Sequence, residues 1–223
     1  MSYFTPDTIQ FLRELPANNN RDWFHENKKR YEKFVKQPFE KFITDFISLL
    51  KNEGLVLDEI TAKDCIFRIH RDIRFSKDKT PYKIHVSALI SSNGRKSVNS
   101  FGIYIELSGE RIRLYGGAYM PSSDILQKIR QKIYNEPERL TKLISAKKFK
   151  DNFGEIHGEE NKRINKPFSE IVEKYPLILK KSYYYFKEYP TELILDEDLL
   201  RNLQQDFKII QPLNAYFEEG INL

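Results

Sequence analysis

The densest group of ionisable side chains in this sequence lies between residues 68 and 83, which read RIHRDIRFSKDKTPYK. Six lysines and arginines stand there against two aspartates, so this stretch supplies four of the five net positive charges of the chain. Guanidinium and ammonium groups bind carboxylate, phosphate and sulfate. Because the arginines alternate with Ile69, Ile73 and Phe75, we expect the segment to be anchored in a core. A cation placed there needs an anionic partner, either internal or bound.

The first interpretation of this segment is a binding site for a small anionic or phosphorylated ligand. If residues 66–75 form a strand, Arg68 and Arg74 share one face and would clamp the anion. Arg71 and Asp72 would form a supporting pair, and the loop that follows would add a charge and a hydroxyl group. The predicted ligand-binding residues in this segment are Arg68, Arg71, Asp72, Arg74, Asp78, Lys79 and Tyr82.

The second interpretation of the same residues is an internal ion-pair network that binds no ligand. Asp72 and Asp78, with carboxylates of the N-terminal region such as Asp22 or Glu26, would then neutralise the arginines and tie the helical region to the sheet. The chain would in that case be a non-catalytic structural or interaction module. Both interpretations stay open at the level of sequence, and neither names a reaction or a catalytic residue.

Gly116 and Gly117 form a second candidate binding element, ahead of a helix start at Pro121-Ser122. Glycines allow the backbone to approach a ligand, and a helix N-terminus presents free N–H groups to an anion. The alternative is a sharp strand-to-helix turn with serine caps. We include both glycines in the predicted ligand-binding site. They do not form a P-loop, because no Gly-Lys-Ser or Gly-Lys-Thr follows at the required spacing.

Metal, cofactor and nucleic-acid signatures are weak. His70 and Asp72 fall on one face of the predicted strand, but neither they nor His85 have a second carboxylate at a diagnostic interval. We therefore predict no metal site and no cofactor. Aromatic residues beside basic ones could stack on bases, yet no RNA-binding or helix-turn-helix motif accompanies them. Nucleic acid is therefore the least favoured ligand.

Hydrophobic periodicity divides the chain into a helical region at 7–52, a sheet at 60–118, and helices with mixed elements at 122–220. Period-two alternation predicts strands at 66–75, 84–90, 101–107 and 112–114, with an Asn-Gly hairpin turn at 93–94. Residues 147–168 are predicted to be a long mobile excursion, and residues 182–186 have strand propensity. A helix starting at Asp196 is predicted to end before Pro212.

Length and composition fit a single α+β domain spanning 1–223, with N-terminal helices, a central antiparallel β-meander sheet, and C-terminal helices packed on the sheet. No apolar run is long enough to cross a bilayer, so we expect no membrane partner. Cys65 is the only cysteine and the N-terminus lacks a secretory signal, which together predict a cytoplasmic location. The sequence does not predict an oligomeric state.

Two stretches read together resemble a known family. The residues concerned are Phe11-Leu12, Asn18-Asn19-Asn20-Arg21, Trp23-Phe24, Lys28 and Tyr31 in the first, and Arg68, Arg71-Asp72, Arg74-Phe75, Asp78-Lys79 and Pro81-Tyr82-Lys83 in the second. Gly116-Gly117, Tyr119 and Pro121 fit the same pattern. In order and spacing these residues resemble the bacterial and fungal domain of unknown function (DUF) 2461, over nearly the full chain. No activity is established for that family, so the resemblance implies which positions matter and leaves their role open.

Overall fold

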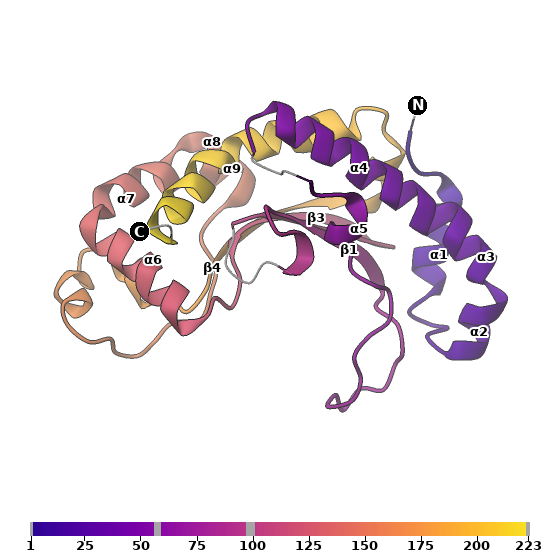
Figure 1. Cartoon of the computed structure of the whole chain (residues 1–223), viewed down its shortest axis with the longest axis horizontal. Coiled ribbons are helices and arrows are strands. Elements are labelled where there is room, and N and C mark those ends of the chain that lie inside the picture. The colour runs from indigo at the N-terminus through magenta and orange to yellow at the C-terminus, as the bar shows by residue number, and fades with distance from the viewer. Residues whose placement is uncertain (1, 56–58, 97–100, 222–223) are drawn as a thin grey trace. The chain divides into compact units, whose positions relative to one another are not determined.

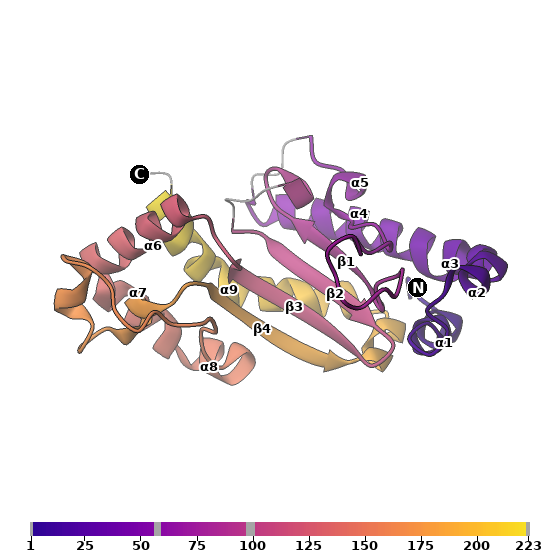
Figure 2. The same ribbon diagram turned by 90° about the horizontal axis from the view of Figure 1, so that it is seen from below.

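The computed structural model describes residues 2–55, 59–96 and 101–221 (Figure 1). Its sheet contains β1 (His85–Ile90), β2 (Ile103–Ser108), β3 (Arg111–Ala118) and β4 (Tyr183–Pro190). The strands are antiparallel and lie in the order β1-β2-β3-β4, so each pairs with the strand before it in sequence (Figure 2). The predicted α+β class and the central antiparallel meander are confirmed.

The chain divides into two compact units. Unit 1 comprises Met1–Lys96, Tyr104–Leu114 and Glu188–Gln204, and unit 2 comprises Ser97–Ile103, Tyr115–Lys187 and Gln205–Leu223. Strands β2, β3 and β4 and the last helix contribute residues to both units. None of the helices in the described ranges is long and apolar enough to cross a bilayer.

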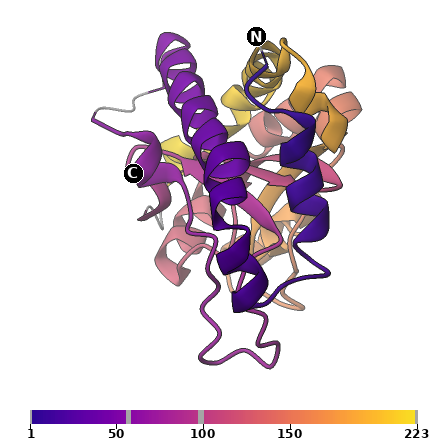
Figure 3. The same cartoon turned by 90° about the vertical axis from the view of Figure 1, so that its right-hand side faces the viewer.

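The N-terminal helices belong to unit 1 and lie beside one another (Figure 3). They are α1 (Pro6–Glu14), α2 (Arg21–Glu26), α3 (Lys28–Tyr31), a π-helical turn at Glu32–Lys36, and α4 (Gln37–Asn52). Local sequence explains where they begin: Thr5 and Thr8 form a capping box ahead of α1, and the Asn20 side chain accepts the Trp23 N–H at the start of α2. Helix α4 packs on β1 and on the short helix α5 (Ala62–Cys65). The predicted helical region at 7–52 is confirmed.

The strand predicted at 66–75 is absent. After α5 the chain is extended but pairs only through single bridges in the described structure, Ile66 with Ala88 and His70 with Tyr82. Residues 71–81 then form a loop that projects from unit 1 (Figures 1 and 3). Ile69 is buried as predicted, but Phe75 is 95% exposed. Side chains within the loop bond to one another and to its backbone, and such local bonds compete with strand pairing.

Unit 2 contains α6 (Ser123–Asn135), α7 (Pro137–Ser145), α8 (Lys147–Phe153) and most of α9 (Leu199–Ile221). Short 3₁₀ turns occur at Phe168–Ile171 and Pro176–Leu179 here, and at Gly94–Lys96 and Thr191–Leu195 in unit 1. The predicted irregular excursion from 147 to 168 is therefore wrong at its start. Phe149 and Phe153 are buried and anchor α8.

Helix α9 also differs from its prediction, because it runs through Pro212 to Ile221. The residues after the proline, Leu213, Tyr216 and Phe217, are buried, and this packing outweighs the roughly 3 kcal/mol cost of an interior proline. In unit 2 the helix packs on the sheet, with Asn214 Oδ1 accepting the Gly117 N–H at 3.2 Å. The predicted packing of the C-terminal helix on the sheet is confirmed.

Candidate anion-binding site

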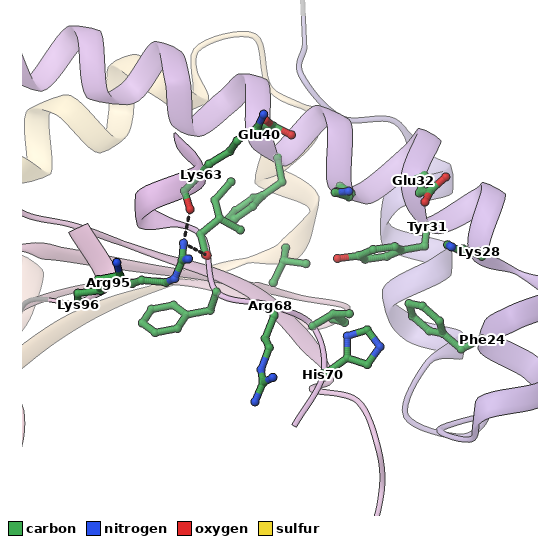
Figure 4. A pocket seen from close by; sticks show the side chains of 16 residues that line it. Phe24, Lys28, Tyr31, Glu32, Glu40, Lys63, Arg68, His70, Arg95 and Lys96 are labelled. Atoms are coloured by element: carbon green, nitrogen blue, oxygen red, sulfur yellow. Dashed lines mark hydrogen bonds between the residues drawn. The ribbon is translucent and has the colours of Figure 1, made fainter. Parts of the chain in front are cut away.

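A hollow of about 880 Å³ lies in unit 1 between the N-terminal helices and residues 63–70 (Figure 4). Its walls are largely apolar and aromatic, and include Phe24, Tyr31, Phe39 and Ile69. The charged residues that line it are Lys28, Lys36, Lys63, Arg68, Arg95 and Lys96, with Glu32 and Glu40. Six cations against two carboxylates leave the hollow strongly positive. We call it the basic hollow.

None of these six cations forms an ion pair within the part of the chain that the structure describes. Arg95 is the best anchored of them: it donates to the backbone carbonyls of Lys63 and Ile66, the latter at 3.0 Å (Figure 4). Carbonyl oxygens orient this guanidinium but carry no net charge to neutralise it. No carboxylate of the described chain therefore lies within ion-pair distance of these six cations, although Arg95 and Lys96 act electrostatically on Asp64.

A second hollow of about 650 Å³ shares Phe24, Lys28 and His70 with the first. Two of its lining residues are stacked: the Tyr82 ring lies on Phe24 with centroids 4.0 Å apart and an interplanar angle of 16°. The Asn19 side chain holds Tyr82 in register by accepting its N–H at 3.0 Å and donating to its carbonyl at 2.8 Å. An amide side chain, and not a carboxylate, thus ties the helical region to this segment.

The loop arginines have internal partners, and these are Asp72 and Asp78, the two loop carboxylates that the second interpretation named. Arg71 Nη1 lies 2.5 Å from Asp78 Oδ2 and also donates to the Thr80 hydroxyl and carbonyl. Arg74 makes two bonds to Asp72, at 3.0 and 2.7 Å. The Arg74 contact lowers the pKa of Asp72 to about 2. The supporting pair expected between Arg71 and Asp72 is therefore wrong.

Arg74 and Lys79 line neither hollow. Lys79 donates to the Ile73 carbonyl at 3.0 Å, within the loop. The expected convergence of Arg68 and Arg74 on one strand face does not occur, because the loop carries Arg74 away from the extended segment. Asp22 lines the second hollow, and neither it nor Glu26 forms an ion pair with these arginines in the described chain.

Arg68 differs from the loop arginines. It lines the basic hollow, and in the described ranges it makes no hydrogen bond and no ion pair. Figure 4 shows its side chain pointing away from Tyr31 and Glu40, on the other side of its own segment. Arg68 nevertheless acts electrostatically on Lys83. Burial lowers the pKa of Lys83, and the positive charge of Arg68 lowers that pKa further. Arg68 and Lys83 therefore repel one another electrostatically.

Gly116 and Gly117 lie on β3 in unit 2. Gly117 has a φ of +90°, and a Cβ there would overlap the carbonyl oxygen of Tyr183 on β4. A Cβ on Gly116 would lie 2.5 Å from the Tyr185 ring. The close backbone approach that these glycines allow is thus an approach of neighbouring protein, and Ser122 caps α6 five residues later. Their ligand-binding role stays a prediction.

Sequence reasoning missed most of the cations of the basic hollow. One signal was present, because Lys28, Glu32, Lys36 and Glu40 follow one another at four-residue spacing and so share one helix face. Lys63, Arg95 and Lys96 had no such signal, since only folding brings their segments together. In the described ranges, no three His, Cys, Asp or Glu side chains gather as metal ligands.

Comparison with known families adds one finding. A family model described as "Conserved hypothetical protein (DUF2461)" matches residues 7–216 of the chain. The match includes every residue that lines the two hollows. Among curated proteins, none matches the chain.

Proposed function

The chain belongs to the DUF2461 family of conserved hypothetical proteins, and from that premise we propose that unit 1 binds a small anionic or phosphorylated ligand in the basic hollow. Arg68 is the residue of the arginine-rich segment that we assign to binding. Lys28, Lys63 and Arg95 are assigned to it by their place around the same hollow.

The observation that carries this proposal is the set of six lysine and arginine side chains that lack ion-pair partners in the described chain. Like charges held together by a fold repel one another, and the repulsion is relieved when an anion enters. Each charge-assisted hydrogen bond contributes roughly 1.5–3 kcal/mol. Two or three of them suffice to hold a phosphate group at the rim.

The walls of the basic hollow suggest the rest of the ligand. Phe24, Tyr31 and Phe39 give it an aromatic lining, and such surfaces bind flat or apolar groups. We therefore propose a ligand with a phosphate or carboxylate group attached to an apolar or aromatic body. No catalytic step is part of this proposal.

The alternative function, a structural module with an internal ion-pair network, is favoured by the loop. Arg71 and Arg74 are both neutralised there, by Asp78 and Asp72. We propose that these loop residues brace the edge of the binding region and do not themselves bind ligand. We also propose a cytoplasmic location, which is supported by the single cysteine, Cys65, being free and buried.

The test is a thermal-shift screen of the purified protein against sugar phosphates and nucleotides at low salt, followed by calorimetry on any ligand that raises Tm. Lys28→Gln and Arg68→Gln should each weaken binding about tenfold or more, the loss of one charge-assisted contact. Lys29→Gln is the matched control, because Lys29 is exposed on the same helix and lines neither hollow. The proposal is wrong if no compound raises Tm, or if Lys28→Gln binds as tightly as Lys29→Gln.

A further inference from the structure

A second charged cluster lies on the open face of the unit 1 sheet. Strands β1, β2 and β3 bury Val86, Ile105 and Ile112, so the residues that alternate with them lie on the opposite face. The polar residues on that face include Lys83, His85, Tyr104, Glu106, Arg111 and Arg113. Lys83 comes from the extended segment just before β1 and therefore lies next to His85 on this face.

His85 and Glu106 form the centre of the cluster. His85 Nε2 lies 3.7 Å from Glu106 Oε2, and both side chains are largely shielded from solvent. The Tyr104 hydroxyl lies 3.4 Å from the same oxygen. Arg113 is 3.9 Å from Glu106 but is bonded more closely, at 2.8 Å, to Glu188. Glu106 therefore lies among His85, Tyr104 and Arg113, with the imidazole beyond hydrogen-bond distance.

Lys83, which acts electrostatically on His85, and Arg68, which acts on Lys83, have no carboxylate within ion-pair distance in the described chain. Lys83 is half-buried, and its Nζ lies 4.9 Å from the centre of the Phe67 ring. Arg68 makes neither an ion pair nor a hydrogen bond to the described residues and acts electrostatically on Lys83. A half-buried ammonium next to a guanidinium is unfavourable without a counterion. Glu106 acts on Lys83, and Asp72 on Arg68, only from beyond ion-pair distance, so a bound anion would supply the close counterion that these two cations lack in the described chain.

We propose that Lys83, Arg68 and His85 form an anion site for a doubly charged tetrahedral oxyanion, sulfate or a phosphate-ester group, and that His85 takes up a proton when the anion binds. The site shares Arg68 with the proposed function, but Lys83 and His85 do not line the basic hollow, so variants at these two positions test it separately. Protonated imidazole has two N–H donors. One faces Glu106, and the other is free to serve the anion.

The direction of the proton coupling follows from the neighbouring groups. Burial lowers the pKa of His85 below its usual 6.5; Lys83 and Arg113 act in the same direction, and Glu106 opposes them. The imidazole is therefore neutral near pH 7 in the free protein. A dianion beside Lys83 reverses the local field and raises the pKa of His85. By linkage, the anion must then bind more tightly to the protonated form.

The test uses sulfate, whose charge is constant above about pH 3, and follows the pKa of His85 by NMR. Its imidazole signal is identified among the four histidines by its loss in His85→Gln. Sodium sulfate should raise the pKa of His85 by about 0.5 or more over sodium chloride at equal ionic strength, which corresponds to about threefold tighter binding to the protonated form. Lys83→Met should abolish the rise, and Lys83→Arg should retain it.

Lys63→Gln is the control that separates this site from the basic hollow, because Lys63 lines the hollow and should leave the sulfate-induced rise intact. The inference is overturned if the pKa of His85 is the same in sulfate and chloride. It is also overturned if Lys83→Met and the unmodified protein show the same rise. Retention of the rise in Lys83→Arg shows that positive charge, and not the lysine stem, is what the site needs.

Discussion

Replacing Gly117 with alanine should cost about 3 kcal/mol or more of unfolding free energy, far above the usual cost of one methyl group. Gly117 has a φ of +90° on β3, and a residue with a Cβ pays about 1–2 kcal/mol in that region. The new methyl group would also overlap the Tyr183 carbonyl oxygen, a backbone atom that cannot turn aside. The strand must shift, and its N–H bond to Asn214, worth about 1 kcal/mol, weakens with it.

Gly54→Ala is the matched control for this prediction. Gly54 has nearly the same φ, +87°, but no described atom lies within 4 Å of a Cβ built there. Its cost should be the conformational term alone, about 1–2 kcal/mol. Urea unfolding followed by far-UV circular dichroism gives both values, and hydrogen exchange of the β3 and β4 amides shows whether the loss is local.

The comparison of the two alanine variants tests whether Gly117 is required by the close approach of β4. A cost for Gly117→Ala within about 0.5 kcal/mol of that for Gly54→Ala would refute the reasoning. It would mean that the backbone of β4 leaves room beside Gly117. The position would then be open to a ligand, as the sequence interpretation allowed.

Three further predictions concern the loop at residues 71–81 and the effect of Glu219 on stability at low pH. Arg71→Gln should lower Tm by about 3 °C, because Asp78 and Thr80 lose their shared donor. Arg74→Gln should leave Tm unchanged, because the ion pair between Arg74 and Asp72 is exposed. Phe75→Ser should leave Tm unchanged, since the ring is 95% exposed; a loss of several degrees would show that the ring packs. Arg139 and Lys132 lower the pKa of Glu219 from 4.5 to about 2, so its stabilisation is complete above pH 4.5 and is lost as pH falls toward 2. Glu219→Gln should make the urea midpoint depend less on pH over that range. An unchanged dependence of the midpoint on pH would contradict the role assigned to Glu219.

The sequence by itself determined the elements that depend on neighbours along the chain. Thr5 and Asn20 mark helix starts, and apolar spacing at three and four residues predicts the helices of 7–52 because a helix buries one stripe. The alternation of Ile103, Ile105 and Leu107 predicts β2 because a strand buries every second residue. The arginine-rich segment and the glycine pair were enough to indicate the family. All of these patterns are local, so they can be read without knowing the fold.

Only the tertiary structure determined where these local patterns fail to predict the observed element. The alternation of Ile69, Ile73 and Phe75 predicts a strand, yet the side-chain bonds of the loop leave Phe75 in solvent. Burial of Tyr216 and Phe217 carries α9 through Pro212, which the sequence takes as a stop.

The tertiary structure also determined which cations form ion pairs. The arginine-rich segment shows that cations gather, but not which of them have partners: Arg71 and Arg74 do, and in the described chain Arg68 does not. An ion pair depends on distances of a few ångströms between side chains. The basic hollow likewise draws its cations from segments separated by some tens of residues, such as Lys28 and Lys96. No local spacing encodes such distances, so the site exists only once the chain has folded.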